Sequence, residues 1–263
     1  MWTDIKSVYR SAWRFAIVCP LLFLVPVLVE FVQHVMEMRA GMYTGIEQAQ
    51  LVEADQTRLW FGFAKTLAIL LPGYWFVRYV MFDGDAARAR ALQWPALGLF
   101  AVILAIEGAQ SWVGLFAPSL AETIGLQGTA AIAFSVAEFL ALQMLAIYLF
   151  AWSTAWPLGN ASIGPVRSIA IMHGSIGRAA VLMIAAVLPL FLLHFGISAV
   201  AIVSGGPASD WALMALDSVV VGFLALTMAG VAPYAARRAA ERKGIDLLHR
   251  QNRMGVQDRH AHV

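Results

Sequence analysis

The sequence predicts an all-α membrane protein that crosses the bilayer six times, as three helical hairpins with short interfacial helices between them. Apolar residues make up 60% of the 263-residue chain and charged residues only 13%, whereas a soluble domain usually carries about 25% charged residues. The apolar residues also gather in stretches of roughly 20, the length that crosses hydrocarbon as a helix. Short alternating segments, typical of a transmembrane β-barrel, do not occur.

The six predicted spans are each long enough to cross the hydrocarbon core at about 1.5 Å per residue. The first is expected to stay uncleaved, because Glu30, Gln33 and His34 stand where a signal peptide would have small residues. We expect one membrane domain over residues 1–244 and a basic tail over 245–263. The predicted spans cover residues 14–35, 59–81, 95–117, 130–156, 179–203 and 211–234.

The basic residues predict the orientation. Most of the 18 lysines and arginines lie before the first span, after spans two and four, and in the tail. Loops rich in Lys and Arg stay in the cytoplasm, so both termini are expected there.

The Ala-rich, Lys-poor composition is typical of a bacterial inner membrane. The tail predicts contact with anionic lipids, with docking of a soluble protein as the alternative, and a net charge of +2 gives no reason to expect nucleic acid.

Short helices are predicted ahead of each outward-going span. Apolar residues recur at helical spacing from Trp2 to Trp13 beside a basic stripe, which predicts a helix on the membrane surface. Asp85 is expected to cap a second short helix, and Pro165 to open a third that ends at Gly174. The chain therefore resolves into three similar units of about 80 residues.

Each predicted span carries one prominent ionisable residue. A charge at the bilayer centre costs about 2.5–3.5 kcal/mol, so these side chains are expected to face the bundle interior and find partners. Together they predict a polar cavity that opens outward. Its predicted residues are Glu30, Lys65, Glu107, Glu138, His194 and Asp217.

The depths of these groups predict which of them meet. Counted from the span midpoints, Glu30 and Lys65 both lie about 7 Å toward the outer side, so they are expected to form an ion pair. The other four fall between the midplane and a similar depth. Four acids against one lysine indicate a site for a proton or a cation. The alternative is that these groups only hold helices together, at about 0.6 kcal/mol per contact.

Three prolines fall near the membrane midplane. Pro26, Pro72 and Pro189 are predicted to kink their helices, because proline removes a backbone hydrogen bond. Transporters use broken helices at this depth to bind substrates. The alternative is that proline is simply frequent in membrane helices.

Two further patterns concern packing. Aromatic residues around Arg78 predict a belt at the inner interface with a snorkelling arginine, and a pocket for a lipid headgroup or a quinone-like molecule is the alternative. Gly222 and Gly230 in span six allow close helix contact, which is compatible with a homo-oligomer or a larger membrane complex.

No recognised catalytic motif is present, so the sequence favours a non-enzymatic role and leaves catalysis open. Cys19 is the single cysteine, and no metal or other cofactor is expected. The best-supported hypothesis is a small-solute or ion permease that could be coupled to protons. The alternatives are a non-catalytic scaffold or assembly subunit, and a lipid-handling membrane protein.

Overall fold

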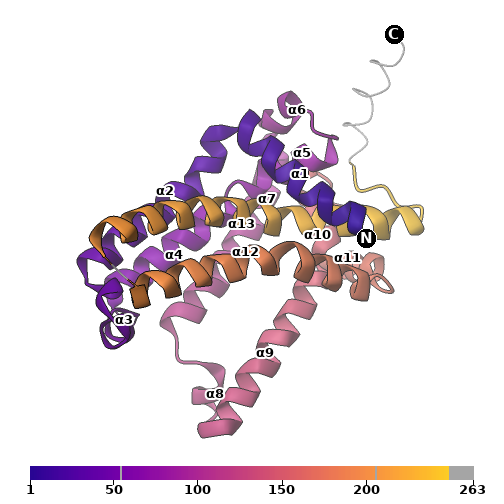
Figure 1. Ribbon diagram of the computed structural model, residues 1–263. Helices are drawn as coiled ribbons and strands as arrows, with labels where there is room; N and C mark the ends of the chain where they lie inside the picture. The colour runs from indigo at the N-terminus through magenta and orange to yellow at the C-terminus, as the bar shows by residue number, and fades with distance from the viewer. Residues whose placement is uncertain (54, 205, 249–263) are drawn as a thin grey trace.

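The computed structural model describes residues 1–53, 55–204 and 206–248, which form helices and loops without a strand (Figure 1). Six membrane-length apolar helical segments occur among these residues, which confirms the predicted polytopic helical fold. They are α2 (Pro20–Arg39), α4 with α5 (Gln56–Leu70 and Gly73–Met81), α7 (Trp94–Phe116), α9 (Gly128–Tyr148), α12 (Ile176–Ser204) and α13 (Pro207–Arg242).

Shorter elements connect the spans, and the three predicted short helices are among them. Asp85 caps the second of these by accepting from the backbone N–H of Arg88, and Pro165 opens the third. The helix of the last span continues to Arg242. The connecting elements are α1 (Trp2–Val18), η1 (Met42–Thr44), α3 (Ile46–Glu53), α6 (Ala86–Arg90), α8 (Leu120–Thr123), α10 (Phe150–Ala155), η2 (Trp156–Leu158) and α11 (Pro165–Met172).

The first span begins later than predicted. The short helix α1 continues to Val18, Cys19 leaves the helical conformation with φ −132°, and Pro20 starts α2. Proline lacks an N–H and its ring clashes with the preceding turn, so it favours the first position of a new helix. The span therefore covers residues 20–39 rather than 14–35. This shift brings Glu37, a loop residue by the sequence prediction, into the membrane-length helix.

The three midplane prolines differ in their effect. The helix is interrupted at Pro72, where α4 ends at Leu70 and α5 begins at Gly73. By contrast, α2 continues past Pro26 and α12 past Pro189. The structure thus interrupts the helix at one of the three prolines, and the kinks at Pro26 and Pro189 stay predictions.

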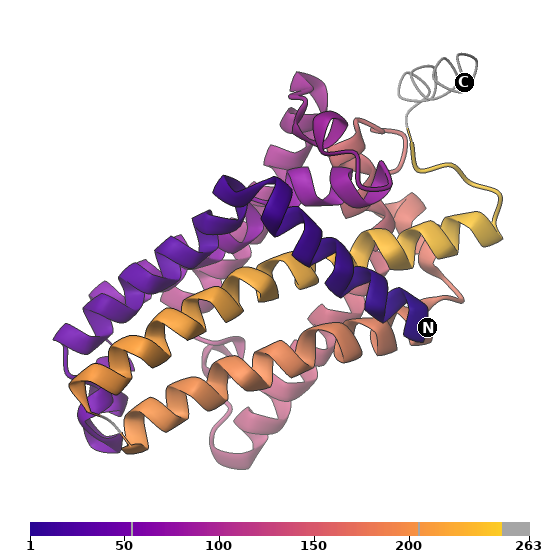
Figure 2. The same cartoon turned by 45° about the horizontal axis from the view of Figure 1, so that its top comes forward.

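Helix α13 is the centre of the bundle. It contacts α12, α2, α5, α10, α1, α11 and α4. In its most apolar stretch of 18 residues, 56% of the residues are buried, whereas the corresponding share in α9 is only 6%. Helix α7 packs on α4 and not chiefly on α13, and α8 and α9 extend away from the other spans, so the tip at α8 stands apart in Figures 1 and 2. A site assembled from several helices is therefore expected beside α13.

Two glycines let other helices approach α13 closely. A Cβ on Gly222 would lie 2.5 Å from Cγ2 of Val27 and 2.8 Å from the ring of Phe23, both on α2. A Cβ on Gly230 would lie 2.9 Å from the ring of Phe76. These small residues are therefore used within the molecule, and they no longer indicate a contact between copies of the chain.

Arg78 does not snorkel, contrary to the prediction. Its side chain is only 1% exposed, and it donates hydrogen bonds to the carbonyls of Arg88, Ala89, Ala91 and Pro157. The guanidinium therefore satisfies carbonyls at the end of α6 that have no partner within that helix. With its donors engaged by the protein, Arg78 gives no support to a lipid-headgroup pocket.

Helix α1 crosses α13 in Figure 2, and Asp4 ties it to the ends of two spans. Arg178 of α12 donates to its carboxylate at 2.7 Å and Arg238 of α13 at 3.3 Å. Burial alone would raise the pKa of Asp4, but the hydrogen bond from Arg178 and the charge of Arg238 outweigh it, so the pKa is lowered. The folded state therefore favours the ionised form.

The packing at Gly222 predicts a loss of stability on Gly222→Ala. The added methyl group overlaps Val27 and Phe23, and overpacking of this kind costs about 1–3 kcal/mol. Gly196→Ala on α12 is the control, because a Cβ added there would meet nothing within 4 Å, and alanine at this position is expected to be neutral or stabilising by up to about 1 kcal/mol. Thermal unfolding in detergent measures both. Equal melting temperatures for the two variants would contradict the close contact.

A second prediction concerns the pH dependence of α1 docking. Because the pKa of Asp4 is lower in the folded state, its contribution is present above the unfolded pKa of about 3.9 and is lost as the pH falls through the folded pKa. We expect Asp4→Asn to destabilise the protein by less than about 1 kcal/mol at neutral pH, since both arginines are partly exposed. The difference from the unmodified protein should vanish in acid. A constant difference in unfolding free energy at every pH would refute this.

Candidate functional site

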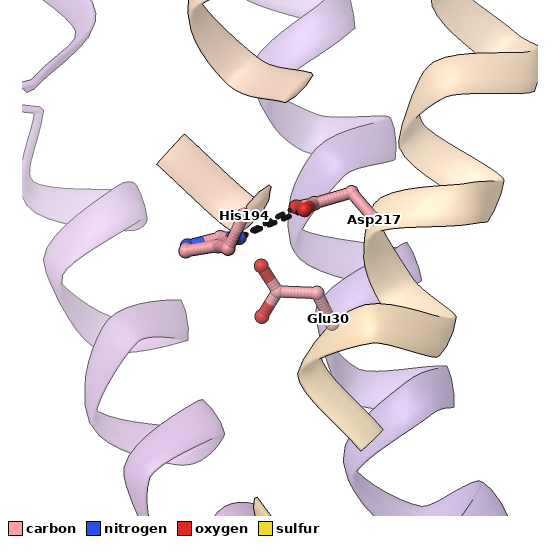
Figure 3. A group of neighbouring side chains, drawn as sticks. All are labelled: Glu30, His194 and Asp217. Carbon is pink, nitrogen blue, oxygen red and sulfur yellow. Dashed lines mark hydrogen bonds and ion pairs between the residues drawn. The ribbon is translucent and has the colours of Figure 1, made fainter. Parts of the chain in front are cut away.

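Four of the six predicted residues lie together beside α13. Lys65 Nζ is 2.8 Å from both carboxylate oxygens of Glu30, which is the ion pair predicted between spans one and two. His194 of α12 lies with its Nδ1 2.8 Å from Oδ2 of Asp217 on α13. Figure 3 shows Glu30 directed toward this His194–Asp217 pair.

His34 lies at the centre of the group, although the sequence prediction does not include it. Its Nε2 is 2.9 Å from Oδ2 of Asp217 and 3.2 Å from Oε1 of Glu30. Its Nδ1 is 2.9 Å from Oε2 of Glu37 and 2.9 Å from the hydroxyl of Tyr43. One imidazole ring is therefore shared by three carboxylates from two spans.

Glu37 is surrounded by donors. Gln33 Nε2 donates to it at 2.8 Å, Arg58 Nε at 2.9 Å and the hydroxyl of Tyr43 at 2.8 Å. Burial and the neighbouring Glu37 carboxylate raise the pKa of Tyr43 above its ordinary value, so this phenol keeps its proton and acts as a donor. Glu37 is therefore an ionised carboxylate, and both of its oxygens accept hydrogen bonds.

The sequence holds a signal for these missed residues. Glu30, Gln33, His34 and Glu37 are spaced by three or four positions, so they share one face of a helix. The predicted span ends at residue 35, which places Glu37 among loop acids. Gly41 turns the chain back with φ +80°, a conformation that glycine adopts readily, and this brings the next short helix toward the same face.

Burial divides the network into a closed centre and a more accessible edge. Glu30 and Asp217 are 0% exposed, and His34 and Glu37 are nearly so. Lys65, Arg58 and His194 retain partly exposed side chains at 21%, 26% and 14%. The polar groups therefore pack against one another and do not line an open cavity, contrary to the expectation from the sequence.

Glu107 and Glu138 do not join the network, which corrects the predicted set. Glu107 is exposed on α7 and Glu138 is half-buried on α9. Neither side chain has a hydrogen bond or ion pair to any residue that the structure describes. Their helices belong to the hairpin that diverges from the bundle, so a similar depth does not bring them near Asp217.

Two open grooves lie elsewhere on the described surface. One, of about 430 Å³, lies between the α8 turn and α9, and the other, of about 390 Å³, between α4 and α7. Neither is lined by a residue of the polar network. No open path to the network is therefore formed by these grooves in this conformation.

The geometry favours a charged His34. Carboxylate oxygens face both ring nitrogens, and the Tyr43 hydroxyl already donates to Glu37. Carboxylates only accept, so both nitrogens must carry hydrogen and the ring is an imidazolium. The carboxylates of Glu30, Glu37 and Asp217 are then balanced by Lys65, Arg58 and His34. The predicted excess of acid is therefore wrong for the assembled network.

Glu30, His194 and Asp217 also have the residue types of a metal site, and one ligand atom from each lies within 4.8 Å of the others (Figure 3). The Glu30 carboxylate is already engaged by Lys65 and His34, and the Asp217 carboxylate by His34 and His194. Because the network is balanced, a divalent ion would add two uncompensated charges to a buried region, which is strongly unfavourable. We therefore interpret the group as a hydrogen-bonded ionic network rather than a metal centre.

Comparison with known proteins found no matching family model, no matching curated protein and no matching solved structure. The class is therefore defined by the fold and the site alone. It is a polytopic helical membrane protein with a buried ionic network across four of its spans.

The network predicts that Glu30→Gln destabilises the fold, because Lys65 and His34 lose their shared charged acceptor. Removing one partner of a buried pair costs about 3–5 kcal/mol, and the partial exposure of Lys65 places the expected loss at about 2–3 kcal/mol. Glu107→Gln makes the same chemical change outside the network and should cost less than about 0.5 kcal/mol. Unfolding in detergent compares them; a larger loss for Glu107→Gln would contradict the assigned network.

Proposed function

We propose that the protein is a small-solute or ion permease whose coupling site is the network around His34. The observation that supports this proposal is the single buried imidazole shared by Glu30, Glu37 and Asp217. Ionisable groups inside membrane spans are expensive, and those that persist in a bundle interior often mark ion pathways and proton relays.

The network also offers a way to change the packing of the spans. It joins α2, α4, α12 and α13, and every link between them in the network includes a charged or titratable group. A change in one charge would alter the attraction among all four helices, which is how an ion can shift a protein between two conformations. The interruption at Pro72 in the second span provides a point where α4 can move relative to α5.

We further propose that the end of the bundle that carries α1, α6 and α11 faces the cytoplasm of a bacterial cell. Two contacts that gather basic residues at this end support the proposal: Asp4 with Arg178, and Asp83 with Arg237. The exposed basic stripe of α1, formed by Lys6, Arg10 and Arg14, would face the anionic headgroups of the inner leaflet. The bases of the tail beyond residue 248 lie outside the described residues.

A membrane scaffold or assembly subunit is a second candidate, which the exposure of α9 favours. This apolar helix is the least buried of the six, so most of its surface is available to lipid or to a partner helix. Crosslinking from α9 in native membranes distinguishes the two, because a scaffold gives a defined heteromeric product and a free permease does not.

Asp217→Asn is expected to abolish or strongly reduce transport. The substitution removes the carboxylate that joins His34 to His194 and should lower flux by about 100-fold or more. The measurement is uptake of a panel of ions and small solutes into proteoliposomes under a pH gradient. Glu107→Gln is the matched control and should transport normally. Undiminished flux through a folded Asp217→Asn protein would overturn the proposed coupling site.

A further inference from the structure

We propose that His34, Asp217 and His194 form a proton-exchange relay, in which His34 holds the exchangeable proton and His194 passes it to and from the edge of the bundle. This proposal rests on the proposed permease function, because it names the proton as the ion to which transport is coupled.

The three side chains form a continuous chain of hydrogen bonds through one oxygen atom. Oδ2 of Asp217 lies 2.9 Å from Nε2 of His34 and 2.8 Å from Nδ1 of His194. Direct proton transfer requires heavy atoms about 2.6–3.2 Å apart, so both steps are within reach without movement of the helices. The two rings come from α2 and α12, and Asp217 of α13 lies between them.

Exposure gives the relay a direction. The side chain of His34 is 3% exposed and that of Asp217 is 0% exposed, whereas that of His194 is 14% exposed. His194 uses Nδ1 toward Asp217, which leaves Nε2 as the nitrogen that can exchange a proton at the edge (Figure 3). His34 has no such freedom, because both of its nitrogens face partners within the protein.

The surroundings of His34 make its proton dependent on other charges. It is faced by Glu30 and Glu37 from its own helix, Tyr43 from η1 and Asp217 from α13. Arg58 and Lys65 of α4 hold the same acids from the other side. Loss of the His34 proton would leave the network with one negative charge in excess. It would also leave a lone pair on one ring nitrogen, which would face a carboxylate or the Tyr43 hydroxyl. Arrival of another positive charge would offset the excess, so the network favours exchange of one proton for one positive charge.

Loading of a neutral His34 proceeds in three balanced steps. A proton binds Nε2 of His194, and the Nδ1–H bond of His194 then breaks as that proton moves to Oδ2 of Asp217. The new O–H bond of Asp217 breaks as its proton passes to Nε2 of His34, which becomes an imidazolium. To regain its starting tautomer, the His194 ring turns so that Nδ1 reaches the edge, where Nδ1 binds one proton and Nε2 releases one, and the ring then turns back toward Asp217. Release follows the reverse order, and no oxidant or reductant is required.

The relay differs from a purely structural ion network in a way that can be measured. A structural network keeps His34 protonated throughout and gives His194 no kinetic role. A relay makes the rate of proton exchange at His34 depend on His194, while the equilibrium charge of His34 depends mainly on its three carboxylates.

The experiment follows the imidazole nitrogens by NMR in histidine-labelled protein reconstituted in lipid nanodiscs, from pH about 5 to about 12. We expect His34 to show two protonated nitrogens at low pH and to become neutral within this range. In His194→Gln the same equilibrium change should remain, but its exchange rate should fall by about tenfold or more. His173→Gln is the control, since His173 is exposed on the loop after α11 and should leave the rate unchanged.

Flux measurements on the same proteins separate this proposal from the permease function. Loss of the dependence of flux on the pH gradient in His194→Gln, with that dependence retained in His173→Gln, supports the relay. A His34 that stays charged across the whole range, or exchanges equally fast without His194, overturns the relay even if solute flux is normal. Proton exchange through His194 without flux of any tested solute supports the relay and rejects the permease.

Discussion

The structure depends on how the carboxylate of Asp217 is neutralised. Asp217 lies on α13, the helix that most other elements contact, and it accepts from His34 of α2 and His194 of α12. The hydrocarbon offers no water to solvate a charge, so each ionised group must find its partners within the protein. The arrangement of the inner helices around α13 is therefore tied to the placement of a few nitrogen and oxygen atoms.

Close backbone approach makes this neutralisation possible. Gly222, five residues after Asp217, lets Val27 and Phe23 of α2 pack directly on α13. A larger residue would hold the helices apart, and His34 would then lose its 2.9 Å contact with Asp217. The same contact between α2 and α13 thus produces both the apolar packing and the polar network. Small residues at an interface let the backbones approach, and this brings the polar side chains beside them within hydrogen-bond distance.

The sequence predicts the features that depend on hydropathy and on depth in the membrane. It does not predict which side chains meet, because this depends on how the helices pack. The six spans, the cap at Asp85 and the Glu30–Lys65 pair follow from local patterns. Glu37 is missed because the predicted span begins at residue 14 instead of Pro20 and so ends at residue 35. His34 then lies at the outer end of the predicted span, away from the depth at which the other groups are expected to meet. Glu107 is included on depth alone, since nothing in one sequence shows that α7 diverges from α13.

The comparison of Glu107 with His34 shows why shared contacts are more informative than depth. A lone carboxyl on a lipid-exposed helix can take up a proton and so avoid the cost of placing a charge in hydrocarbon. This change does not affect the interactions of neighbouring residues. His34 cannot change its charge alone, because Glu30, Glu37 and Asp217 all lose an attractive partner when it does. Imidazole is also the side chain whose charge responds most readily to modest changes in its surroundings near neutral pH. The residue that holds the network together is therefore also the one through which an ion can act on all four helices.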